Sequence, residues 1–260
     1  MRFDDDEQNK ITSPRAKMID ASVEYKVAQE SIDIDACKQF VPFKVWYERI
    51  EAEPNLVVKE IIFNSVSYFG AKKRIGFVKL TTKTYHKDTN HTVPGIVFLR
   101  GDAVCILVVL HCAGKKYALL TSQPRVPIGE SEFLEIPAGM TDGSCNVKGK
   151  AIDEMEEETG FKITCESIFD MGAEVFPDGM FYPSVGACDE GLAVYLHERQ
   201  ISPEAMAELE GKLTGESIHE HIKLVVRPLE DIITLPDSKS VVAYALYQHL
   251  GAQGKIPKLF

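Results

Sequence analysis

The sequence lacks any long apolar run. Its 260 residues contain nothing near the roughly 20 apolar residues of a membrane-spanning helix, and the longest clear run is Ala103 to Leu110. The first residues, Met1 to Glu7, have neither the apolar core of a signal peptide nor the acid-poor, arginine-rich composition of a transit peptide. We therefore expect a cytoplasmic protein that makes no membrane contact.

Basic residues are in short supply. The chain has 29 Lys and Arg against 39 Asp and Glu, which gives a formal net charge of −10. Nucleic acids and anionic membranes attract basic proteins, so this balance argues against either as a partner. A small basic pocket within an acidic protein remains compatible with it.

Paired cysteines are also missing, since no Cys-x-x-Cys occurs. The six cysteines are scattered, at positions 37, 105, 112, 145, 165 and 188. This spacing predicts reduced thiols and excludes a structural zinc site of the usual kind. With 45% hydrophobic and 26% charged residues, the chain can form a sizeable core without disulfides or metals.

The order of elements predicts a mixed α/β (α+β) fold. Val57 to Phe69 and Ile75 to Tyr85 are rich in β-branched and aromatic residues and indicate a hairpin. Helices are expected at Val147 to Thr159, Pro203 to Lys212 and Lys239 to Leu250. We divide the chain into an acidic, partly mobile segment (1–40), a small antiparallel β unit (41–100) and a larger α/β domain (101–260).

One predicted helix carries an unusual cluster of acids. Five acids occupy the six positions from Asp153 to Glu158, and Glu154 precedes Glu157 and Glu158 by three and four residues. These three carboxylates share a helix face, where they repel one another unless a cation joins them. Oxygen ligands without histidine favour Mg²⁺ or Mn²⁺ over zinc. The alternative interpretation is a solvated acidic face.

This segment resembles the signature of the Nudix hydrolases. The matching positions are Gly139, Glu154, Met155, Glu157, Glu158, Gly160 and Phe161. Two positions depart from the signature: Cys145 stands where a Glu is expected, and Asp153 replaces an Arg. Further segments, at 74–77, 94–98, 125–127, 134–140 and 181–190, resemble the plant-type ADP-sugar diphosphatases.

The resemblance implies a Nudix α/β/α sandwich with a mixed sheet. It also implies hydrolysis of the diphosphate of a nucleotide sugar, ADP-sugar preferred, to a nucleoside monophosphate and a sugar 1-phosphate. By position, Glu154 and Glu158 would bind Mg²⁺, for which Mn²⁺ can substitute, with Glu157 assisting and the carbonyl of Ala138 completing the site.

The family also supplies expectations for the general base. In the ADP-sugar and ADP-ribose branch, a Glu in a mobile loop after the signature activates the water. Glu190 is our first candidate and Asp189 the second, and Glu157 is the third.

Substrate contacts follow from the same resemblance. Arg125 is expected on a phosphate, and Arg100 either contacts substrate or only a neighbouring carboxylate. Glu135 is assigned to the same site. Trp46 and Tyr182 are candidates for stacking on the nucleobase, with packing as the alternative.

Related proteins pair their N-terminal β units, so a homodimer is expected.

His219 and His221 have no evident third ligand, so we interpret them as surface residues rather than a metal site. Three readings of the function stay open: the ADP-sugar enzyme, an enzyme for UDP-glucose or ADP-ribose, and a catalytically weak protein that senses nucleotide sugars.

Overall fold

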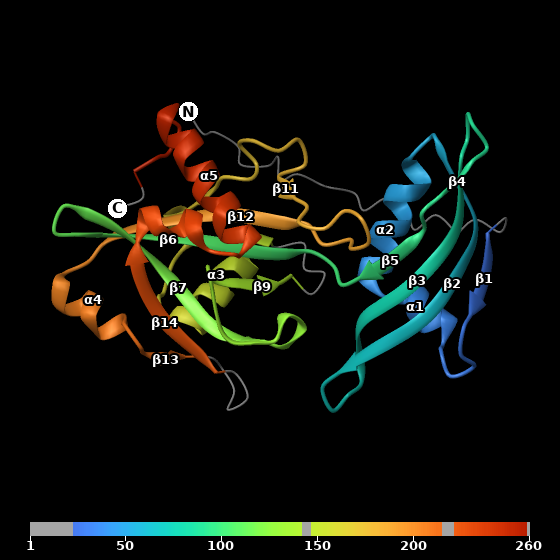
Figure 1. Cartoon of the computed structure of the whole chain (residues 1–260), viewed down its shortest axis with the longest axis horizontal. Helices are drawn as coiled ribbons and strands as arrows, with labels where there is room; N and C mark the ends of the chain where they lie inside the picture. Colours follow the sequence, from blue (N-terminus) through green and yellow to red (C-terminus); the bar gives the residue numbers. More distant parts are fainter. Residues whose placement is uncertain (1–22, 142–146, 215–220, 259–260) are drawn as a thin grey trace, which may run out of the picture.

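A computed structural model describes residues 23–141, 147–214 and 221–258 (Figure 1). The N-terminal part is a five-stranded sheet in the order β1-β2-β3-β4, with β5 also paired to β3. Its elements are β1 (Glu24–Val27), α1 (Ile34–Gln39), α2 (Val41–Ala52), β2 (Leu56–Phe69), β3 (Arg74–His86), β4 (Thr92–Val93) and β5 (Ile96–Leu99).

The helix α2 covers one face of this sheet. Phe43 on α2 is fully buried and lies 5.4 Å, ring to ring, from Phe63 on β2. Leu80 on β3 and Leu99 on β5 belong to the same core. The predicted hairpin of β2 and β3 is confirmed, with its turn at 70–73.

The structure corrects two details of the predicted N-terminal part. Residues 23–40, which we set apart with the acidic segment, fold into β1 and α1, and Cys37 is buried in the core. The sheet is not wholly antiparallel, because β1 pairs with β2 in parallel. The charge count obscured these elements, because their few buried side chains are spaced among exposed acids. The acidic positions before residue 23 lie outside the described residues.

The second sheet has nine strands around the path β10-β12-β6-β7-β14-β13. Its strands are β6 (Ala103–Cys112), β7 (Lys115–Arg125), β8 (Glu130–Glu135), β9 (Ala138–Met140), β10 (Ile168–Asp170), β11 (Met180–Phe181), β12 (Leu192–Gln200), β13 (Leu213–Thr214) and β14 (Ile222–Pro228). The helices are α3 (Val147–Thr159), α4 (Pro203–Leu209), α5 (Ser238–Ala252) and the short 3-10 turns η1 (Val126–Ile128), η2 (Cys165–Ser167) and η3 (Leu229–Thr234).

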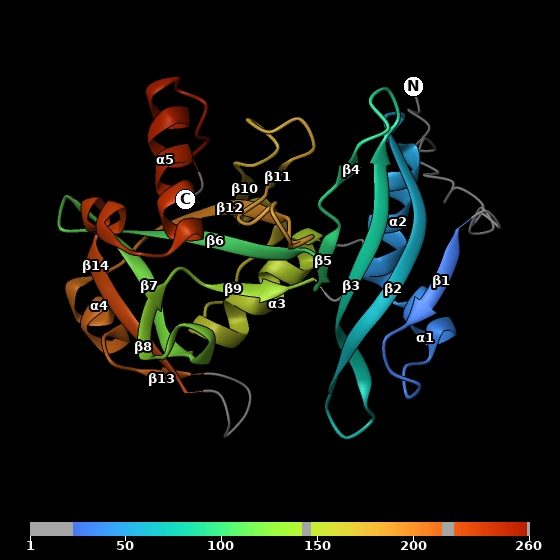
Figure 2. The same ribbon diagram turned by 45° about the vertical axis from the view of Figure 1, so that its right-hand side comes forward.

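The central strand β6 is buried on both faces. Cys105, Leu107 and Val109 pack in the core cluster that includes α5, while their alternate neighbours pack in the cluster that includes α3. A strand covered on both sides reads as a continuous apolar run, as this one does. In Figures 1 and 2, α5 and α3 lie on opposite sides of the sheet. The predicted α/β/α sandwich with a mixed sheet is confirmed, since β12 runs parallel to β6 and antiparallel pairs flank them.

The helix α3 has the predicted bounds, α5 begins one residue earlier and ends two residues later than predicted, and α4 is shorter than predicted. This helix ends at Leu209 and not at Lys212, because Glu210 takes an extended backbone and Gly211 a positive φ of 77°. Between the two sheets, the chain passes from β5 to β6 through residues 100–102. Among the described residues, no helix combines the length and apolar character needed to cross a membrane.

Candidate active site

The acidic segment forms α3 as predicted. Ala151 and Met155 are buried and fix the helix against the sheet, and Glu157 is half-buried. Gly160 closes the helix with a φ of 75°, a conformation that glycine adopts without strain. The side chain of Glu154 and the whole of Cys145 lie outside the described residues, so only part of the expected carboxylate set can be placed.

Glu158 ties this helix to the strand that opens the signature. Its side chain is buried, and its Oε2 accepts a hydrogen bond of 3.1 Å from the backbone N–H of Ala138. Ala138 and Gly139 lie in β9, which pairs with β6. The structure therefore brings Glu158 and Ala138 together, as the family position implied, although the described contact of Ala138 uses its N–H and not its carbonyl.

Carboxylates that could hold a metal are placed only in part. Among the described side chains, no group of three or more His, Cys, Asp or Glu comes close enough to hold a metal ion. Glu154, the central member of the expected set, is not among those side chains. His221 is exposed and belongs to no such group among the described side chains. His219 lies outside the described residues.

Glu190 lies beside Arg100. The guanidinium Nη1 of Arg100 is 3.1 Å from Oε1 of Glu190, and only 16% of the Glu190 side chain is exposed. Burial raises the pKa of Glu190, while the charges of Arg100 and Lys239 lower it and those of Asp189 and Asp102 raise it. A carboxylate whose pKa is raised by burial is a stronger proton acceptor when ionised, which suits a general base.

Asp189 has a different environment. Its carboxylate accepts hydrogen bonds from the backbone N–H of Arg100 at 2.8 Å and of Gly101 at 3.1 and 3.2 Å. Burial raises the pKa of Asp189, and these backbone donors lower it. Because both oxygens are engaged by the backbone, Asp189 is placed to hold the chain in position. This contact pattern weighs against Asp189 as the base.

Asp102 joins three parts of the site. Its Oδ1 accepts a 3.0 Å hydrogen bond from the N–H of Gly191, the residue after Glu190. Its carbonyl accepts hydrogen bonds from both the backbone N–H and the hydroxyl of Thr141, at 3.0 and 2.9 Å, just after β9. Its Oδ2 lies 3.8 Å from the guanidinium of Arg49 on α2. Burial raises the pKa of Asp102, and the Gly191 N–H and Arg49 lower it.

Arg125 and Glu135 are paired with each other. Nε and Nη2 of Arg125 lie 2.7 and 2.5 Å from Oε1 of Glu135. The other oxygen of Glu135 binds Lys239, whose Nζ also lies 2.9 Å from Asp237. Only 2% of the Glu135 side chain is exposed, and its two oxygens hold two cations. Arg125, at 39% exposed, keeps access to a ligand.

This cluster reaches the signature strand. Asp237 caps α5 by accepting hydrogen bonds from the N–H of Ser240 at 3.1 Å and from its hydroxyl at 2.5 Å. The hydroxyl oxygen of Ser240 in turn accepts a hydrogen bond of 3.0 Å from the N–H of Ile136, two residues before Ala138. Burial lowers the pKa of Lys239, but the neighbouring carboxylates of Glu135 and Asp237 outweigh burial and raise it.

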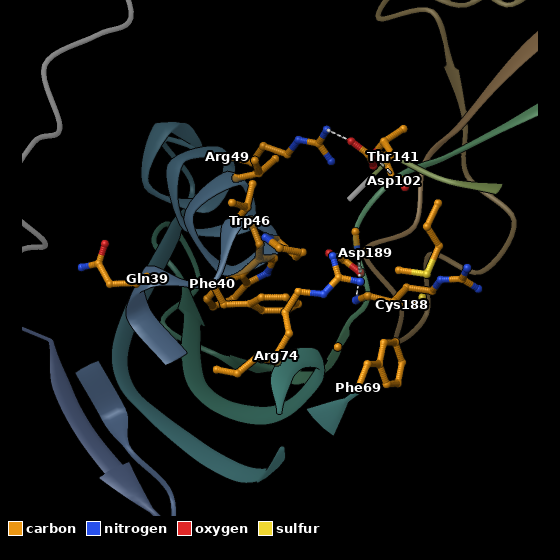
Figure 3. Close-up of a pocket in the computed structure, with 18 of the residues that line it drawn as sticks. Gln39, Phe40, Trp46, Arg49, Phe69, Arg74, Asp102, Thr141, Cys188 and Asp189 are labelled. Carbon is orange, nitrogen blue, oxygen red and sulfur yellow. Dashed lines mark hydrogen bonds and ion pairs between the residues drawn. The ribbon is translucent and has the colours of Figure 1, made fainter. Parts of the chain in front are cut away.

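A cavity of about 720 Å³ lies between the two sheets, beside residues 100–102 (Figure 3). Trp46 and Arg49 line it from α2, and Tyr182 lines it from the other side. The Arg49 guanidinium lies 5.9 Å from the centre of the Tyr182 ring. Arg74 and Arg100 also line the cavity, as do Met140 and Thr141 at the end of β9. The structure therefore brings both predicted stacking aromatics to one cavity.

Sequence reasoning missed Arg49, Asp102 and Lys239. A signal existed for Arg49, because it follows Trp46 by three residues, a spacing at which two side chains share one face of a helix such as α2. No sequence pattern pointed to Asp102 or Lys239, since both act on residues far away in the chain.

Comparison with known proteins identifies the family. The chain is 36% identical over 225 residues to "Nudix hydrolase 14, chloroplastic" of Arabidopsis thaliana, covering 82% of this chain and 72% of that relative. It is 33% identical over 98 residues to "Putative nudix hydrolase 2" of Caenorhabditis elegans, covering 36% and 44%. No family model matches the chain. The chain belongs to the Nudix hydrolase family.

The fold also resembles that of a solved structure. The Nudix chain superposes on the crystal structure of an ADP compounds hydrolase with a TM-score of 0.53 at 16% identity, covering 79% of this chain and 99% of the other. At that identity the likeness concerns the fold.

Proposed function

We propose that this Nudix hydrolase cleaves the diphosphate bond of a nucleoside diphosphate sugar, with ADP-sugars preferred. The products would be a nucleoside monophosphate and a sugar 1-phosphate. The observation that carries the proposal is the cavity lined by Trp46 and Tyr182 and also by Met140 and Thr141, which lie at and just after the end of β9 in the signature. An aromatic, arginine-lined cavity leading to the signature is suited to a base, a diphosphate and a reacting phosphorus in that order.

Each part of the site has a proposed task. Trp46 and Tyr182 stack on or flank the nucleobase, and Arg100 and Arg125 hold the diphosphate oxygens. Glu190 accepts a proton from the attacking water. Its raised pKa fits this task, because burial makes a carboxylate a stronger base. Glu157 stays the alternative base, since it is half-buried on the same helix as Glu158.

The donors in the signature suit Mg²⁺, for which Mn²⁺ can substitute. An observation that supports this fit is the buried carboxylate of Glu158, which accepts a hydrogen bond from the N–H of Ala138 at the start of β9. Glu154, Glu157, Glu158 and the Ala138 carbonyl would be the ligands, all of them hard oxygens. Mg²⁺ bound there would neutralise phosphate charge and lower the pKa of the attacking water.

The test is a panel of ADP-glucose, UDP-glucose and ADP-ribose, each assayed for release of nucleoside monophosphate with Mg²⁺ and with EDTA. We expect metal-dependent release, fastest from ADP-glucose. Faster turnover of UDP-glucose or ADP-ribose would support the proposed reaction but contradict the preference for ADP-sugars. Binding of ADP-glucose without release of AMP at any metal concentration would favour the sensor, an alternative that the Asp153 substitution in the signature motivates.

We also propose a homodimer formed through the N-terminal sheet. Ile62, Thr81 and Ile96 lie abreast in the register of β2, β3 and β5, on the face opposite the α2 core. Ile96 is 57% exposed, which leaves apolar surface on a single chain. Sedimentation should give a dimer for the natural chain and a monomer for Ile96→Asp. A natural chain that is monomeric at micromolar concentration would contradict this.

A cytoplasmic location is proposed from the cysteines. The five cysteines in the described residues are free, which is typical of a reducing compartment. The Arabidopsis relative is named as chloroplastic, a statement about that relative. Imaging a fluorescent fusion of the full chain tests the location, and an organellar signal would contradict it.

A further inference from the structure

Two short segments are bound to each other at almost every residue. Residues 100–102 join the two sheets, and residues 189–191 carry Glu190. The Asp189 carboxylate accepts from the backbone of Arg100 and Gly101, and the Asp102 carboxylate accepts from the N–H of Gly191. The segment that borders the cavity therefore holds the residues on both sides of Glu190.

Arg100 contacts both Glu190 and the cavity. Its side chain is 30% exposed, lines the cavity and pairs with Glu190 at 3.1 Å. Its Nε is buried and has no hydrogen-bond partner among the described residues. An unsatisfied buried donor is costly, and a guanidinium has five donors in a planar fork that matches phosphate oxygens. Arg100 therefore has donors left for an anionic ligand.

The groups that face Glu190 decide what a change at Arg100 does. They are two cations, Arg100 and Lys239, and two anions, Asp189 and Asp102. Burial of Glu190 raises its pKa, and Arg100 is the stronger of the two cations that lower it. If the guanidinium moves to another anion, the pKa of Glu190 rises, because its counter-charge is withdrawn.

We propose that Glu190 and the diphosphate of the substrate share Arg100: the guanidinium holds the Glu190 carboxylate in the empty site, and a bound diphosphate draws it away. Arg100 is then a positioning residue that links filling of the cavity to release of the base. This proposal rests on the hydrolase function proposed above.

The chemical step balances around this exchange. The oxygen of water forms a bond to one phosphorus, while the bond from that phosphorus to the bridging oxygen breaks and its electron pair leaves with the second phosphate. Glu190 takes one proton of the water and later gives it up to solvent or to the leaving phosphate. Releasing Glu190 from Arg100 frees the oxygen lone pair that takes this proton.

The most direct test follows the titration of Glu190 itself. The carboxyl carbons of Glu are labelled with ¹³C in the full chain, and the Glu190 signal is assigned by its loss in Glu190→Gln. Inorganic pyrophosphate, with EDTA present, is the probe, and inorganic sulfate is its control. We expect pyrophosphate to raise the pKa of Glu190 in the natural chain, and Arg100→Gln to raise it without any ligand. Pyrophosphate should add less in Arg100→Gln than in the natural chain.

Arg49→Gln is the matched control, because Arg49 lines the same cavity but its ion pair is with Asp102. It should shift the Glu190 titration much less than Arg100→Gln does. A Glu190 titration that neither pyrophosphate nor Arg100→Gln moves would overturn the proposal. The pyrophosphate arm uses the natural chain, so it decides the matter even if Arg100→Gln does not fold.

Kinetics give a second readout. For Arg100→Gln we expect KM to rise about 10- to 100-fold, as for the loss of a hydrogen bond to a charged group. The acidic limb of kcat/KM should move to higher pH, and Arg100→Lys should restore the limb but not the KM. A limb that stays in place would mean that Arg100 only binds substrate. If the protein hydrolyses the nucleotide sugar but the pKa of Glu190 does not move, only the sharing of Arg100 is refuted. If the pKa of Glu190 moves but no hydrolysis is found, only the proposed function is refuted.

Discussion

Replacing Lys239 by Met should destabilise the fold by about 3 kcal/mol. Lys239 is a buried cation, with 13% of its side chain exposed, and its partners Glu135 and Asp237 are 2% and 8% exposed. Removing one member of a buried ion pair costs roughly 3–5 kcal/mol, because the other charge is left without compensation. The lower end of this range of free energies applies here, because Glu135 still forms its ion pair with Arg125 and Asp237 still accepts the hydrogen bond from Ser240.

This cost corresponds to a fall in the melting temperature of roughly 6–12 °C for a chain of this size. Pairing with Glu135 and Asp237 raises the pKa of Lys239, so its stabilisation is complete below the ordinary lysine pKa and is lost as the pH rises through the folded value. It should therefore be constant across the neutral range. At strongly alkaline pH, the natural chain should lose stability faster than Lys239→Met.

Urea unfolding followed by circular dichroism measures the difference. The fluorescence of Trp46, the single tryptophan, follows the N-terminal part separately and tests whether the two parts unfold together. Lys255→Met is the matched control, because Lys255 and Glu174 are 48% and 43% exposed and 3.9 Å apart, and it should change stability by less than about 0.5 kcal/mol. Equal stability of the two variants would refute this reasoning.

Three further predictions concern the reaction. Glu158→Gln should abolish turnover at an unchanged melting temperature, because the amide oxygen can still accept from Ala138; wild-type turnover at limiting Mg²⁺ would exclude Glu158 as a ligand. Glu190→Gln should lower kcat by about 10²–10⁴ with little change in KM, and an unchanged steady-state rate would transfer the role of base to Glu157. Asp153→Arg should reach half-maximal rate at a lower Mg²⁺ concentration, because an Arg at this signature position can orient a ligating glutamate through a charge-assisted hydrogen bond; an unchanged metal dependence in a titration would contradict that.

Much of the fold could be predicted because its determinants are local. The run at 103–110 has the length and composition of a strand buried on both faces, and Gly160 marks the end of α3. The elements at 23–40 were missed because their burial depends on pairing with β2 and on packing against α2. Neither the charge count nor the hydrophobic pattern of such short segments shows these contacts with β2 and α2.

The candidate site could be predicted only where a motif marks it. Glu158, Ala138 and Glu190 were found because a family signature or loop carries them. Lys239 and Asp102 were not found, because Lys239 is 104 residues from its partner Glu135 in the chain and Asp102 is 89 from Gly191. Such contacts depend on the topology of the sheets. The resemblance assigned Glu135 to the substrate site, but it did not indicate that the fold buries this residue between two cations.

The central claim is that this Nudix chain hydrolyses a nucleotide sugar with the help of a divalent metal. The decisive measurement is the release of AMP from ADP-glucose by the purified full chain over a titration of Mg²⁺, with glucose 1-phosphate determined in the same samples. We expect equal amounts of AMP and glucose 1-phosphate, a rate that saturates with Mg²⁺, and no release of either product in EDTA. Absence of AMP at every Mg²⁺ and Mn²⁺ concentration, in samples where calorimetry shows that ADP-glucose is bound, would contradict it.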